Sequence, residues 1–223
     1  MEKKIYSAGT TKINYYVQGK SPELLLVSGI HGDEYGVIDS AIKVLSKLQS
    51  EMPEFLYIPE ISPTAVKAKT RCNCNGVDIN RSFKDGATEV EAKIVMDFLK
   101  DRKFNTFISF HEDPEHSGFY FYDSGNMEND ECLPRLRNNV KNLGVELLNG
   151  VDDPHDEHLG VEFVDGYKAN RTSGDGGPNC AFGPWLVSRG IVDRIYCMEV
   201  PGMLDPDLKD KLVEKILYNL VIC

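Results

Sequence analysis

A short apolar strand that leads through glycine-rich polar residues into a helix constrains the fold most strongly. Residues 23–28 read ELLLVS and lie between Pro22 and Gly29. A strand without polar alternation is typical of a sheet that is buried on both faces. The helix that follows is expected to pack one side on this sheet, because its apolar residues recur at helical spacing. These residues are Val37, Ile38, Ala41, Ile42, Leu45 and Leu48.

Further strands and helices alternate along the chain. Strands are predicted within 5–18 and at 55–58, 106–110, 119–122 and 194–200, and helices are predicted behind a capping box at 88–91, near 134–148 and from Asp205 onward. Residues 59–85 and 150–190 are expected to be largely irregular. This order predicts an α/β fold in which a mixed, mainly parallel central sheet is flanked by helices on both faces. Residues 1–223 are expected to form a single domain.

Composition restricts the partners. The 223 residues contain 25 basic and 35 acidic side chains, for a formal net charge of -10. This balance argues against nucleic acid and against anionic membrane surfaces. The longest apolar run, residues 24–27, is far too short to cross a membrane, and the N-terminus lacks a secretory signal. The scattered cysteines are read as reduced thiols, which favours a cytoplasmic location.

Unusual polar residues follow three of the predicted strands. His31 and Glu34 come after the first buried strand, His111 after the strand TFISF, and Glu199 at the end of RIYCM. Because the carboxyl ends of parallel strands share one edge, these side chains are expected to converge. Two imidazoles and a carboxylate suit zinc, and a further carboxylate could act as a general base. Each residue alone is more typical of a surface or an ion pair.

The loop at residues 71–83, RCNCNGVDINRSF, supplies a second candidate set. It carries Arg71, Asn80 and Arg81. Arginine binds carboxylates in a bidentate manner, so the loop could hold an anionic part of a ligand. Ordinary loop capping and surface ion pairs are the alternative interpretation of the same residues.

Four ordered motifs, SGIHGDE, NCNGVDINRSF, FISFHE and YCMEVPG, resemble the zinc carboxypeptidase superfamily over residues 24–202. That group includes metallocarboxypeptidases and the succinylglutamate desuccinylase/aspartoacylase deacylases. The resemblance implies a single catalytic domain that uses one Zn²⁺ ion. It implies zinc ligation by His31, Glu34 and His111, activation of water by Glu199, oxyanion stabilisation by Arg71, and binding of the substrate carboxylate by Asn80 and Arg81.

The chain departs from the family pattern in several places. The stretch between Glu34 and His111 is shorter than in digestive-type carboxypeptidases. Tyr167 is the candidate for the family's mobile substrate-binding tyrosine, although its flanking residues do not fix the alignment. The deacylase branch usually adds a small β-rich domain after the catalytic one, whereas this sequence stops one helix after Glu199. That difference favours the carboxypeptidase branch.

The resemblance therefore implies hydrolysis of an amide bond next to a substrate carboxylate, in a small peptide or an N-acyl amino acid. A zinc-dependent N-acyl amino acid deacylase is the alternative, and a non-catalytic binding protein is a third reading. The oligomeric state is left open. His116, His155 and His158 are read as loop histidines outside the site, and Glu112 as a residue that points away from it.

Overall fold

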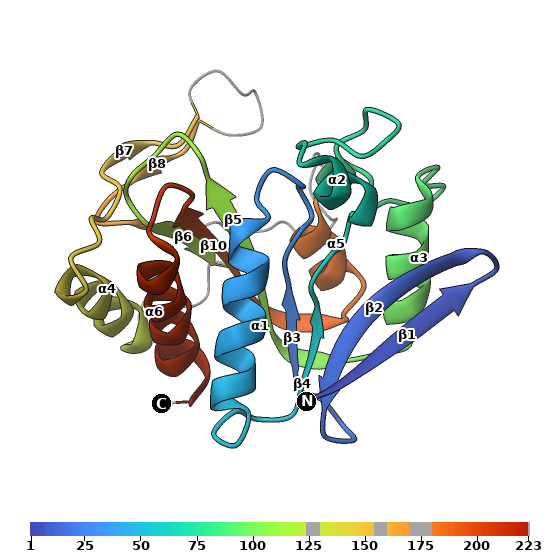
Figure 1. Cartoon of the computed structure of the whole chain (residues 1–223), viewed down its shortest axis with the longest axis horizontal. Coiled ribbons are helices and arrows are strands. Elements are labelled where there is room, and N and C mark those ends of the chain that lie inside the picture. The colour runs from blue at the N-terminus through green and yellow to red at the C-terminus, as the bar shows by residue number, and fades with distance from the viewer. Residues whose placement is uncertain (124–129, 154–159, 170–179, 223) are drawn as a thin grey trace.

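A computed structural model describes residues 1–123, 130–153, 160–169 and 180–222. An eight-stranded sheet runs through the molecule (Figure 1). A separate two-stranded sheet joins β7 (Gly150–Val151) to β8 (Glu162–Phe163). The strands of the main sheet are, in spatial order, β1 (Glu2–Ala8), β2 (Thr11–Gln18), β4 (Phe55–Ile58), β3 (Leu24–Val27), β5 (Phe104–Asp113), β10 (Val192–Pro201), β6 (Tyr120–Asp123) and β9 (Tyr167–Ala169).

The centre of the main sheet is parallel, as the alternation of strands and helices predicts. Strands β4, β3, β5 and β10 pair in parallel, and so do β6 and β9. Antiparallel pairing joins β1 to β2, β2 to β4 and β10 to β6. The prediction of a mixed, mainly parallel sheet is therefore confirmed, and the carboxyl ends of β3, β5 and β10 share one edge.

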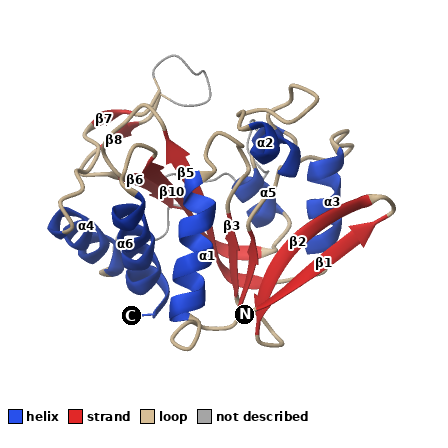
Figure 2. Ribbon diagram, viewed as in Figure 1, coloured by secondary structure: helices blue, strands red, loops and turns tan. Residues whose placement is uncertain are grey.

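Helices cover both faces of the sheet, which explains the continuous apolar strands. The helices are α1 (Gly36–Leu48), α2 (Pro63–Ala68), α3 (Val90–Leu99), α4 (Cys132–Asn142), α5 (Phe182–Ser188) and α6 (Pro206–Leu217). One face packs its apolar side chains on α1, α4 and α6, and the other on α3 and α5. Figure 2 shows α1 and α6 side by side over the first of these faces.

Successive residues of a central strand therefore belong to two different cores. On β5, Phe110 packs with the α1, α4 and α6 side, whereas Phe107 packs with the α3 and α5 side. On β10, Met198 and Ile195 are divided in the same way. Because side chains alternate along a strand, His111 and Glu199 lie on the α3 and α5 side of the sheet.

Several local predictions are wrong. Strand β5 continues to Asp113, so His111 lies within the strand and not after it. The helix predicted near 134–148 begins earlier and ends at Asn142. No capping box forms at 88–91, because the Glu91 carboxylate instead accepts hydrogen bonds from Ser62 and Thr64.

The two stretches expected to be irregular contain regular elements. Residues 59–85 include α2 and a 3-10 helix, η1 (Ile79–Arg81), and residues 150–190 include β7, β8, β9 and part of α5. His155, His158 and the glycine-rich residues 172–177 lie outside the described residues. A π-helical turn, η2 (Tyr218–Ile222), follows α6. No helix in the described part of the chain is long and apolar enough to span a membrane.

Candidate metal centre

His31 and Glu34 lie on the tight connection between β3 and α1. The connection packs against α2: the amide of Gly32 donates to the carbonyl of Thr70 at 2.9 Å. A Cβ atom on Gly32 would come within 1.9 Å of the carbonyl carbon of Ala65, so only glycine fits between the loop and the helix. This close approach holds His31 and Glu34 in a buried position at the carboxyl end of β3.

The structure brings together the three residues predicted to bind metal. Glu34 bridges the histidines, with one carboxylate oxygen 2.5 Å from Nδ1 of His31 and the other 2.8 Å from Nδ1 of His111. The ligand atoms of the three residues lie within 4.8 Å of one another, and all three residues are buried. Among the residues that the structure describes, they form the one such group able to share an ion. Two imidazole nitrogens and a carboxylate are a donor set that suits Zn²⁺.

The cluster is electrostatically unusual for a buried site. Burial opposes the charged form of His31, but Glu34 and Asp78 outweigh burial, and the pKa of His31 lies above its usual value. Burial likewise opposes the charged form of His111, yet Glu34, Cys197 and Glu199 hold its pKa well above the usual range. Burial would raise the pKa of Glu34, whereas the two imidazoles lower it strongly. The carboxylates around the two imidazoles therefore favour positive charge at this site, either as protons on the rings or as a bound cation.

Asp78 is a functional candidate that sequence reasoning did not assign. Its carboxylate lies 3.3 Å from Nε2 of His31 and 3.1 Å from the guanidinium of Arg71. Burial acts against ionisation of Asp78, but His31, Arg71 and Arg81 lower its pKa well below the ordinary value. A carboxylate on the second ring nitrogen fixes the tautomer and orientation of a metal-binding histidine. Asp78 lies two residues before Asn80 in the motif NCNGVDINRSF, and this position is the sequence feature that could have pointed to it.

The loop that carries the predicted anion-binding residues lies next to this cluster. Asp78 accepts a hydrogen bond from the amide of Asn80 at 2.8 Å and so begins the turn η1. The side-chain oxygen of Asn80 accepts from the amide of Phe182, which ties η1 to the start of α5. Arg81 donates to the carbonyl of Asn80 at 3.3 Å, but its Nε is buried without a hydrogen-bond partner among the residues that the structure describes.

Glu199 lies directly beside the cluster through sheet pairing. It is the register partner of His111 on β5 and of Tyr120 on β6, and these two residues flank it. Burial raises the pKa of Glu199 to about 7, with Glu34 and Asp113 adding to the rise and His111 opposing it. The thiol of Cys197 lies 3.8 Å from the Glu199 carboxylate. A carboxyl group with a pKa near neutrality is suited to exchange protons during a reaction.

Tyr167 does not join the other predicted site residues. It pairs with Phe121 on β6, and both rings belong to the core on the α1, α4 and α6 side. Its hydroxyl donates to Asp123 at 2.7 Å, and the ring also lies 5.6 Å from the guanidinium of Arg137. Glu199 lies on the opposite face of the sheet, so the structure does not bring Tyr167 beside the cluster, and its role in substrate binding stays a prediction.

Glu112 and His116 make contacts outside the metal cluster. Glu112 points away from the cluster, as expected, but it is buried in an ion pair with Lys209 and is not on the surface. His116 contacts the backbone carbonyl of Asp152 at 2.5 Å. Among the described residues, Cys72, Cys74, Cys180 and Cys197 form no disulfide.

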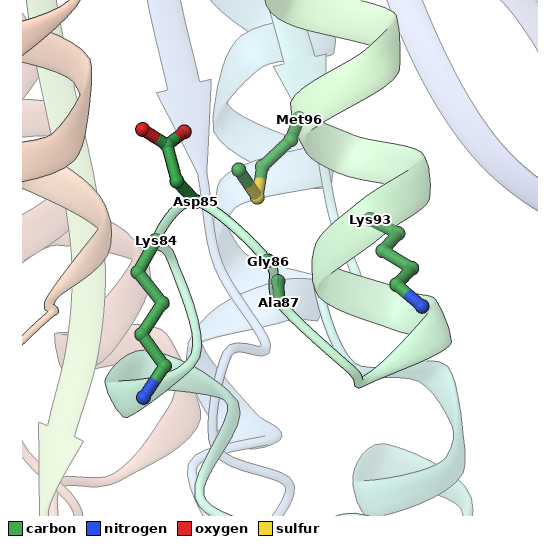
Figure 3. A pocket seen from close by; sticks show the side chains of 6 residues that line it. All are labelled: Lys84, Asp85, Gly86, Ala87, Lys93 and Met96. Carbon is green, nitrogen blue, oxygen red and sulfur yellow. The ribbon is translucent and has the colours of Figure 1, made fainter.

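A surface hollow beside α3 lies apart from the metal cluster (Figure 3). In Figure 3 the amino groups of Lys84 and Lys93 lie on different sides of the loop and do not converge. Asp85, on its rim, forms an ion pair with Arg189. The hollow offers no set of convergent polar groups, so we assign it no binding function. Its lining residues are Lys84, Asp85, Gly86, Ala87, Lys93 and Met96.

Known structures share this fold. A provisionally identified metallopeptidase from Shewanella denitrificans OS217 superposes with a TM-score of 0.75 at 23% identity, over 98% of this chain and 82% of that one. Murein-tripeptide amidase MpaA from Escherichia coli O157 superposes with a TM-score of 0.61 at 16% sequence identity, over 94% of this chain and 86% of that one. An aspartoacylase family protein from Mesorhizobium loti superposes with a TM-score of 0.58 at 20% sequence identity, over 94% of this chain and 62% of that one.

The fold is thus that of carboxypeptidase-like metallo-hydrolase structures. The names of these neighbours include a metallopeptidase, an amidase and an aspartoacylase family protein. No protein-family model matches the sequence, and no curated protein matches it either. At these low identities the similarity establishes the fold, and the chemistry has to be argued from the residues of this chain.

Proposed function

We propose that this protein is a zinc-dependent hydrolase of the carboxypeptidase type, which cleaves an amide bond next to a substrate carboxylate. One observation carries the proposal. His31, Glu34 and His111 form a buried cluster of metal-binding type, and Glu199 is the register partner of His111. Zn²⁺ held by such a set supplies a Lewis acid and a bound water of lowered pKa.

Glu199 is the proton-transfer residue in this proposal. Its pKa, raised to about 7 by burial, allows it to accept a proton from the attacking water and later give it to the leaving amine. The strand pairing of β10 with β5 holds the carboxylate beside His111. The Asp78 carboxylate, 3.3 Å from Nε2 of His31, would orient this imidazole from the other side of the ring.

Arg81 and Asn80 would hold the substrate carboxylate. Within the described part of the chain, the buried Nε of Arg81 has no hydrogen-bond partner, so an anionic ligand could satisfy it. The side-chain oxygen of Asn80 accepts a hydrogen bond from the amide of Phe182, so its amide nitrogen would be the atom that donates to a ligand. Arg71, next to Asp78 and 42% exposed, is the candidate for stabilising the oxyanion. These contacts would determine which bond faces the nucleophile.

A zinc-dependent N-acyl amino acid deacylase is the second candidate, because an aspartoacylase family protein shares the fold. Both reactions would place a carboxylate on Arg81.

A substrate panel tests the proposal. The purified protein, loaded with zinc, is offered dipeptides, peptidoglycan-type peptides and N-acyl amino acids, and release of free amine is measured. We expect hydrolysis of peptides with a free C-terminal carboxylate, and loss of hydrolysis when that carboxylate is amidated. Hydrolysis of N-acyl amino acids alone would favour the deacylase, and no hydrolysis of any amide would contradict both candidates.

A further inference from the structure

A buried ion pair lies directly behind the metal cluster, on the opposite face of the sheet. Glu112 follows His111 on β5, and its carboxylate contacts the amino group of Lys209 on α6. The two side chains are only 6% and 7% exposed. No part of the proposed reaction uses either residue. Two buried charges therefore need another explanation.

This pair contacts all three segments that carry the proposed ligands and base. The amino group of Lys209 also donates to the carbonyl of Gly202, three residues after Glu199, at 3.2 Å. Glu112 itself is the neighbour of His111. The third segment is α1, whose first residue is Gly36, two residues after Glu34.

Gly36 packs directly on the pair. A Cβ atom at this position would lie 2.8 Å from both the Glu112 carboxylate and the Lys209 amino group. A backbone hydrogen bond also joins the two strand ends at this point, because the amide of Gly202 donates to the carbonyl of Asp113 at 2.8 Å. The ends of β5 and β10 and the start of α1 thus meet at one pair of opposite charges.

Stability alone is a poor explanation of this arrangement. The desolvation of two buried charges commonly cancels their attraction, and apolar residues of similar size often replace such pairs without loss of stability. Helices α1 and α6 are also joined at their surface, where Lys47 pairs with Glu214 at 2.7 Å. What the buried pair adds is a fixed relation among three backbone segments.

We propose that the Glu112–Lys209 pair is a positioning element that sets the relative placement of Glu34, His111 and Glu199 from behind the sheet. This inference rests on the proposed function, since it assigns the pair a role in metal binding. Glu112 and Lys209 do not touch substrate. They act through the backbone of their neighbours, so their loss should change the geometry of the cluster more than the stability of the fold.

The test uses the double variant Glu112→Met/Lys209→Met, which keeps the side-chain volume and removes both charges together. The control is Lys47→Met, which breaks the surface ion pair between Lys47 on α1 and Glu214 on α6, away from the cluster. Three quantities are measured: the zinc dissociation constant by chelator competition, the visible spectrum of the Co²⁺ form, and the thermal unfolding midpoint of the metal-free protein.

We expect the double variant to unfold at a temperature similar to the control, but to bind zinc about tenfold or more weakly and to show an altered Co²⁺ spectrum. Unchanged zinc affinity and spectrum would overturn the positioning role while leaving the proposed function intact. If the double variant does not fold, the zinc affinity and the Co²⁺ spectrum of Glu112→Asp are measured instead. This variant keeps both charges but shortens the side chain of residue 112. A native protein that binds no zinc would overturn the proposed function and this inference with it.

Discussion

Glu199 lies directly opposite His111 in the parallel pairing of β10 with β5. Both side chains are on the face of the sheet turned away from α1, α4 and α6. The proposed base is therefore placed relative to a proposed ligand by strand hydrogen bonding, and not by a loop. Sites on regular elements hold their geometry more tightly than sites on loops. This relationship yields the first prediction.

Replacement of Glu199 by Gln should abolish turnover while zinc stays bound. The amide keeps the shape of the side chain but cannot accept the proton, so we expect kcat to fall by about a hundredfold to ten-thousandfold. Steady-state kinetics and zinc content are measured together. Glu115→Gln is the control, because Glu115 is an exposed glutamate in the nearby β5–β6 connection. Near-native kcat in the Glu199 variant would show that another group moves the proton.

Replacement of Asp78 by Asn should weaken metal binding. The Asp78 carboxylate lies 3.3 Å from Nε2 of His31, and removing its charge makes that imidazole a poorer and less well oriented ligand. We expect the zinc dissociation constant to rise by about 10–100-fold. Asp85→Asn, which removes an exposed carboxylate paired with Arg189, should leave it unchanged. Equal affinities in the two variants would mean that Asp78 does not support His31.

Zinc affinity should fall as the pH is lowered. A histidine must lose its proton to bind the ion, and Glu34 keeps the pKa of His111 above its usual value despite burial. Competition by protons therefore begins at a higher pH than for free imidazole and strengthens with acidity. Titration calorimetry between about pH 8 and about pH 6 should show affinity falling by about tenfold or more per pH unit. A dissociation constant independent of pH would contradict ligation by the two histidines.

Replacement of Gly32 by Ala should damage both the fold and the site. The new Cβ atom would meet the backbone of Ala65 at 1.9 Å, so the loop carrying His31 and Glu34 has to move. We expect the free energy of unfolding to fall by about 1–3 kcal/mol, together with weaker zinc binding. Gly183→Ala on α5 is the control, since its Cβ atom would make only ordinary contacts of 3.4 Å or more. Denaturant unfolding of both metal-free variants is the measurement.

Much of the fold could be predicted from local pattern. The run LLLV is buried in β3, and the helical spacing of Val37 and its successors gives the buried face of α1. Asp205 caps α6 as its position before Pro206 suggests. The prediction of a capping box at 88–91 is wrong because the Glu91 carboxylate accepts hydrogen bonds from Ser62 and Thr64, which lie far from it in the sequence. Tertiary contacts of this kind leave no trace in local sequence.

Part of the candidate site could also be predicted from local sequence pattern. His31, Glu34, His111 and Glu199 stand out because polar residues interrupt or follow apolar strands. The position of Tyr167 away from the cluster could not be predicted, because its side-chain direction depends on the register of β9 against β6, which composition does not reveal. The sequence pattern does not single out Lys209, and its buried partner is seen only in the packing of α6 on β5.

Elemental analysis of the native protein and of His111→Ala tests the central claim most directly. The control is His116→Ala, which removes a histidine whose ring contacts Asp152 and not the cluster. We predict about one zinc ion per chain in the native protein and in the control, and almost none in the His111 variant. A native protein that holds no zinc after exposure to it, or a His111 variant that retains the ion, would contradict the account.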